Sequence, residues 1–145
     1  MKKILILLFL ILVSTSNAIE NSEFPKWINE LHSNAIKSLQ VEVDISYINL
    51  PDRLEEGKYF VFCLKGKGSL KKVTDPFETM HKMFSSNGWK HILKYGADGH
   101  GSSSFAYEKG NYFCNISVET DSSCDDEETG HVPSKFWFKI YCREK

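Results

Sequence analysis

YFCNISVETDSSCDDEETGHVPSKFWFKIYCR, residues 112–143, contains two alternating segments joined by an acidic loop. Apolar side chains recur at every second position of 112–119 and again of 135–143. A period of two predicts strands that bury one side and expose the other. We therefore expect an antiparallel hairpin across the loop, in which opposite residues have numbers that sum to about 254 to 256.

This register predicts a disulfide bond. It places Cys114 opposite Ile140 or Cys142, and both cysteines fall on the apolar side of their strands. Direct opposition brings the Cα atoms within the limit of about 7 Å that a disulfide requires. We expect Cys114–Cys142 together with Cys63–Cys124. The alternative is Cys114–Cys124 with Cys63–Cys142, which would join the acidic loop to its own strand.

The first 18 residues are typical of a cleavable signal peptide. A basic start at Met1–Lys3 precedes an unbroken apolar run from Ile4 to Val13, and Ser16 and Ala18 are small. The run is shorter than the roughly 20 residues of a membrane-spanning helix. We expect cleavage after Ala18 and export to the periplasm or the medium, with no transmembrane segment left. Residues 19–145 then form one domain, and its four cysteines indicate two disulfides in an oxidising compartment.

The charge balance gives no partner. The whole chain has 18 basic and 19 acidic side chains, and without Lys2 and Lys3 there are 16 basic ones. A nucleic-acid-binding protein would show a basic excess gathered on one face. We therefore expect no nucleic acid as a partner.

The segment before residue 75 predicts one helix and two strands. Apolar residues at steps of three and four predict a helix over 25–39, with Phe24, Ile28, Leu31, Ala35 and Leu39 on one face. A period of two predicts a strand over 41–48. The apolar segment 58–65 predicts a second strand, and Gly66–Ser69 reads as a turn.

A second helix is predicted over 76–87, because both of its ends carry boundary signals. Asp75 is suited to cap the first turn, and Gly88 is suited to the left-handed position after the last turn. Phe84 and Trp89 should then touch across the end of the helix.

The remaining segments predict strands at Trp89–Tyr95, Phe105–Tyr107, 112–119 and 135–143, with a loop at Gly96–Ser104. The resulting order is α-β-β-α-β-β-β-β. Short connections favour an antiparallel sheet, and two amphipathic helices need one face of it to cover. We therefore expect an α+β fold with two helices on a mainly antiparallel sheet of about five to six strands. A small barrel with an N-terminal helix is the alternative.

The acidic loop is a candidate cation site, because it gathers oxygen ligands that calcium prefers. It lacks the spacing of an EF-hand. The candidate ligands are Asp121, Asp125, Asp126, Glu127, Glu128 and His131.

No residue is assigned a catalytic role. A serine-rich loop holds His100, but the nucleophile elbow Gly-x-Ser-x-Gly is absent from it. We expect His81 in solvent and His91 on a core-facing strand position. A small secreted hydrolase that uses His100 or His131 with nearby carboxylates, with or without a metal, is the alternative function.

The first hypothesis is therefore an exported, non-catalytic module that binds or inhibits a partner or supports the envelope. The partner is a protein or a small ligand, and no cofactor is expected. Exposed aromatic side chains would mark the interface. The candidates are Trp27, Tyr47, Tyr107, Trp137 and Tyr141.

Overall fold

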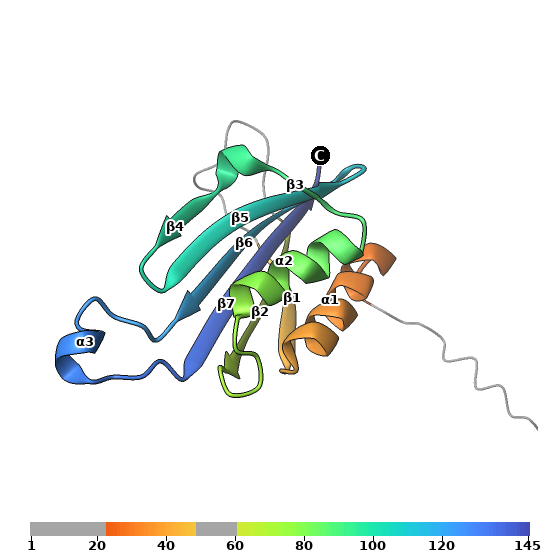
Figure 1. Cartoon of the computed structure of the whole chain (residues 1–145). Coiled ribbons are helices and arrows are strands. Elements are labelled where there is room, and N and C mark those ends of the chain that lie inside the picture. Colours follow the sequence, from red (N-terminus) through yellow and green to blue (C-terminus); the bar gives the residue numbers. More distant parts are fainter. Residues whose placement is uncertain (1–22, 49–60) are drawn as a thin grey trace, which may run out of the picture.

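The computed structural model of the chain describes residues 23–48 and 61–145 (Figure 1). The expected signal peptide, with its cleavage site after Ala18, lies outside the described residues. So does the beginning of the strand expected from Lys58. The described part is one α+β unit of helices and an antiparallel sheet, which confirms the predicted fold class.

The elements, in chain order, are α1 (Lys26–Leu39), β1 (Val43–Tyr47), β2 (Phe62–Ser69), α2 (Pro76–Ser86), β3 (Lys90–His91), the 3₁₀ helix η1 (Leu93–Tyr95), β4 (Ala97–Gly99), β5 (Ser102–Lys109), β6 (Tyr112–Thr120), α3 (Asp126–Thr129) and β7 (Lys135–Glu144). The sheet order is β1-β2-β7-β6-β5-β3, and β4 pairs with β5. The sheet is open, so the barrel alternative is wrong. Figure 1 shows α1 and α2 side by side over one face of this sheet.

Both long helices follow their sequence patterns. α1 buries Ile28, Leu31, Ala35 and Leu39, as its spacing predicted. None of the helices in the described ranges is both long enough and apolar enough to span a membrane.

The ends of α2 also follow the sequence. The Asp75 carboxylate accepts a hydrogen bond of 2.8 Å from the backbone N–H of Glu78. Gly88 has a φ of +77°. The Trp89 N–H donates to the Phe84 carbonyl, and the two rings meet edge to face at 5.4 Å. The predicted boundary signals of this helix are therefore confirmed.

Gly66–Ser69 continues β2 and is not the expected turn. Gly66 lies opposite Phe138, and Gly68 lies opposite Phe136. A Cβ atom at these glycines would lie 2.7 and 2.4 Å from a carbon of the facing ring. The phenylalanine rings thus fill the space over the glycines, and packing across the sheet overrides the turn preference of the Gly pair.

The segment after α2 differs from the expectation in two places. The expected strand Trp89–Tyr95 shrinks to β3, and its last residues form η1. The expected loop Gly96–Ser104 contains a hairpin of β4 with the start of β5. Gly101 allows the tight turn of this hairpin, with a φ of +69°. On its other side β5 pairs with β6, where Ser102 lies opposite Glu119.

The β6–β7 hairpin has the predicted register, with Cys114 directly opposite Cys142. Their sulfur atoms form a disulfide across a Cα–Cα distance of 4.1 Å, on the buried side of the sheet. The first predicted bond is confirmed, and the alternative Cys114–Cys124 pairing is excluded.

The expected Cys63–Cys124 bond is not formed. Cys63 is a buried free thiol and Cys124 is an exposed one. Cys63 lies opposite Tyr141 on β7. The acidic loop that carries Cys124 joins β7 next to Phe136, five residues away from Tyr141. Five residues of strand span about 17 Å, far beyond the reach of a disulfide.

The caps of α2 give a test of the fold. We expect Asp75→Ala to lower the free energy of unfolding by about 1 kcal/mol, because it removes the hydrogen bond to the first turn. Gly88→Ala should cost about 1 kcal/mol, because alanine is strained at positive φ. The matched control is Asp125→Ala, since Asp125 precedes α3 without making a side-chain cap. Urea melts measure all three, and a cost at Asp125 equal to that at Asp75 would contradict the capping role.

Candidate binding surface

The side of the sheet opposite the helices carries a lysine-rich surface at one end of β2 and β7. Alternation along β7 buries Phe136 and Phe138 and exposes Lys135, Trp137 and Lys139. β2 exposes the residues flanking Gly66 in the same way. The exposed set is Lys65, Lys67, Lys135, Trp137 and Lys139, which we call the basic face.

Trp137 lies at the centre of this face and is 42% exposed. It pairs with Lys67 on one side and with Glu119 on the other. Lys135 and Lys139 are its neighbours on the same face of β7. The aromatic ring therefore has lysines on three sides and one carboxylate on the fourth.

Lys65 and Lys139 lie directly opposite each other on β2 and β7. Like charges in this position destabilise a sheet. Their positive charge also acts on Cys63, which lies two residues before Lys65 on the same face of β2: burial raises the pKa of the Cys63 thiol, and the two lysines lower it in part. Lys65 has a second neighbour across the strands, Asp44 on β1. Among the described residues paired with Lys65 and Lys139, Asp44 alone carries a compensating charge.

Two depressions flank the basic face. An open groove of about 1060 Å³ lies on the β1 side and is lined in part by Lys65, Lys67, Trp137 and Lys139. A smaller hollow of about 320 Å³ lies on the β6 side, between Trp137 and Ser117. The ring of Trp137 thus stands between two concave regions, and a ligand could contact both of its edges.

The aromatic residues expected to mark an interface do not form one patch. Tyr107 is buried, and Trp27 stacks on Tyr112 at 4.2 Å on the helix side. Tyr47 is 50% exposed, but its hydroxyl donates to the Glu23 carbonyl. The others, Trp137 and Tyr141, share the face of β7 that turns away from the helices.

The acidic loop, residues 121–134, uses its carboxylates mainly to shape itself. Asp121 accepts hydrogen bonds from the backbone N–H groups of Ser134 and Lys135, and these bonds lower its pKa. Asp126 accepts from the N–H and hydroxyl of Ser123, which lowers the pKa of Asp126 as well. The described residues contain no cluster of three or more metal-ligating side chains. Cation binding by this loop stays a prediction.

The histidines of the alternative hydrolase lie at the exposed corner formed by this loop and the β4–β5 turn. His131 Nε2 lies 2.8 Å from the Asp121 carbonyl oxygen, and its contact to the Asp121 carboxylate is 3.8 Å. His100 is exposed. Asp121 is held by the backbone, so its carboxylate orients the loop. Hydrolysis at this corner stays a prediction.

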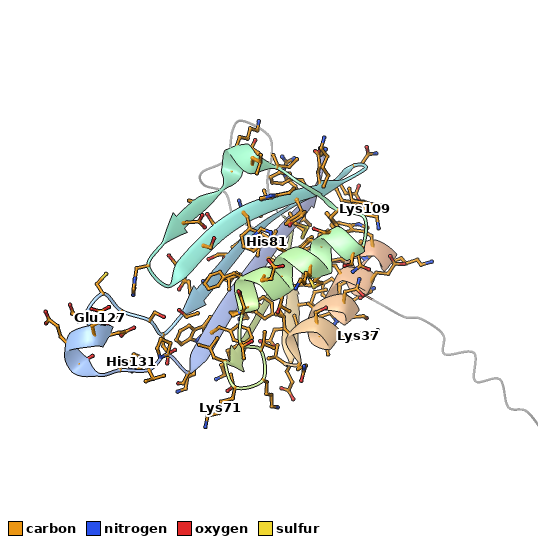
Figure 2. All side chains as sticks on the ribbon, viewed as in Figure 1. Lys37, Lys71, His81, Lys109, Glu127 and His131 are labelled. Atoms are coloured by element: carbon orange, nitrogen blue, oxygen red, sulfur yellow. A yellow bond between two sulfur atoms is a disulfide. The ribbon has the colours of Figure 1, made fainter. Side chains whose placement is uncertain are left out.

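His81 is only partly exposed, whereas the expectation placed it in solvent. Its ring stacks on Phe105 at 4.1 Å, and its Nδ1 lies 2.7 Å from the Tyr107 hydroxyl (Figure 2). The ring of His91 lies 5.2 Å away, and its buried Nε2 has no hydrogen-bond partner within the described part. The sequence pattern does not reveal this contact, because His81 falls at the margin of the helix face, where the facing strand determines burial.

This packing predicts a pH dependence of stability. Burial first, and then the nearby charge of His91, lower the pKa of His81, while Glu78, Asp98 and Asp75 act in the opposite direction. The folded state therefore favours neutral His81. At a pH below the unfolded value of about 6.5, the unfolded chain binds the extra proton, so stability falls as pH falls through this range until the lowered pKa is reached.

We expect wild type to lose stability relative to His81→Gln between about pH 7.5 and 5. Urea melts across this range measure the difference, with His131→Gln as the exposed control. A wild-type curve parallel to that of His81→Gln would contradict the effect.

The basic face is the main feature that was not predicted from the sequence. The signal is the alternation in KGKG (residues 65–68) and KFWFK (residues 135–139), which puts every lysine on one side of its strand. Only the pairing of β2 with β7, which are far apart in sequence, brings the two sets together.

Comparison of the chain with protein-family models, with curated proteins and with solved structures gives no match.

Proposed function

We propose that this chain is an exported, non-catalytic binding module whose basic face docks an acidic surface of a partner protein. The observation that carries the proposal is the opposition of Lys65 and Lys139 beside the exposed Trp137. Such a like-charge pair costs stability, and an anionic partner would offset that cost. The sequence led us to expect a module that binds or inhibits a partner or supports the envelope. Of these roles we propose partner binding, guided by charge.

A protein partner suits the arrangement best. Protein interfaces commonly have a central aromatic anchor and a polar rim, and tryptophan is enriched among the residues that dominate binding energy. Trp137 takes the central position, and Lys67, Lys135, Lys139 and Glu119 surround it at the rim. Single-stranded nucleic acid usually stacks its bases on several aromatic residues in succession. The basic face holds one.

Export is supported by the disulfide between Cys114 and Cys142, because disulfides persist in oxidising compartments. We expect the mature protein to begin at Ile19, since Ser16 and Ala18 fit the cleavage site. Mass spectrometry of periplasmic and secreted fractions determines the N-terminus. Protein that keeps Met1 would contradict export by this route.

The binding role is tested with a labelled oligoglutamate peptide of about ten residues, followed by fluorescence anisotropy at low salt. We expect Trp137→Ala and Lys67→Glu/Lys139→Glu each to weaken binding about tenfold or more, because they remove the anchor and reverse the charge. The matched control is Lys26→Glu/Lys37→Glu on α1, which changes the net charge equally on the other side of the sheet.

Equal loss in the control would mean that net charge alone controls binding, and would contradict the role of the face. A single-stranded oligonucleotide of the same charge serves as a second probe. Tighter binding of the oligonucleotide through the same residues would contradict a protein partner.

A further inference from the structure

The lysines of the basic face form no ion pair with any residue that the structure describes. The ion pairs of the described residues are Lys26–Glu30, Lys82–Glu78, His131–Asp121 and Lys145–Glu108. None of them includes Lys65, Lys67, Lys135 or Lys139. Four cationic side chains around an exposed tryptophan therefore stay open to a partner.

The acidic loop carries the opposite charge and projects away from the sheet. Figure 1 shows α3 beyond the ends of β6 and β7, and Figure 2 labels Glu127 on this helix. Asp125, Glu127 and Glu128 are exposed, and none forms an ion pair with another described residue. We call this loop, residues 121–134, the acidic arm, because it projects from the sheet.

Hydrogen bonds shape the acidic arm at two places. Its base is tied to the start of β7 by the Asp121 carboxylate, which accepts from Ser134 N at 2.7 Å and from Lys135 N at 2.9 Å. Asp126 ties the turn before α3 through Ser123. An arm that is ordered before binding loses less conformational entropy when it docks.

We propose that the acidic arm of one copy docks on the basic face of a second copy, so that the protein self-associates. This rests on the proposed function, because it names the occupant of the same face. The three exposed carboxylates of the arm are opposite in sign to the four lysines and similar to them in number. Because every copy carries both an arm and a face, two copies can exchange arms in a closed two-fold pair.

Sedimentation velocity of the mature chain tests this proposal. A Cys124→Ser background prevents an intermolecular disulfide through the exposed thiol of the arm. We expect dimers at about 20 mM salt and monomers at about 500 mM salt, because exposed charges are screened. A chain that is monomeric at low salt would overturn the proposal.

Charge reversal locates the contact. Glu127→Lys/Glu128→Lys on the arm and Lys67→Glu/Lys139→Glu on the face should each weaken self-association about tenfold or more, because each places like charges together. An equimolar mixture of the two variants should associate again, because both contacts then join opposite charges. Far-ultraviolet circular dichroism and urea melts confirm that each variant is folded.

Association that survives reversal of the face, or a mixture that stays monomeric, would overturn the proposal. The oligoglutamate assay distinguishes failure of self-association from failure of the proposed binding function. A chain that stays monomeric but binds the peptide through Trp137 refutes self-association and leaves the binding function standing. A chain that fails both tests refutes both.

Discussion

The pairing of β7 with β2 on one side and with β6 on the other determines on which side of the sheet each of its residues lies. A slip of one residue would exchange the two sides completely. In the observed register Phe136, Phe138, Ile140 and Cys142 enter the core beneath the helices. The rest of the structure depends on this choice, because β7 lies inside the sheet and connects its two halves.

Two features make this register specific. The disulfide joins Cys114 to Cys142 at directly opposite positions, so a shifted pairing would separate them. The glycines of β2 accept the rings of Phe136 and Phe138, and any side chain at those positions would collide with a ring. The same register that completes the core therefore brings the lysines of two strands together on the outer side.

The sequence predicted those parts of the fold that local chemistry determines. The caps of α2 and the hairpin that brings Cys114 to Cys142 follow from residue types at short spacing. Gly66–Ser69 was misjudged as a turn, because the rings that fill the space over the glycines come from a distant strand. The basic face was missed for the same reason. Long-range pairing decides which side chains become neighbours, and a single sequence does not state it.

The central claim is that Trp137 is exposed within a region of positive charge. Quenching of its fluorescence by iodide and by caesium tests this directly, with the Trp137→Phe protein subtracted to remove the signals of Trp27 and Trp89. We expect the negatively charged iodide to quench the Trp137 component several times more efficiently than caesium at low salt. The difference should shrink at high salt, because the lysine charges are screened. Equal quenching by the two ions at low salt, or no quenching by either, would contradict the account.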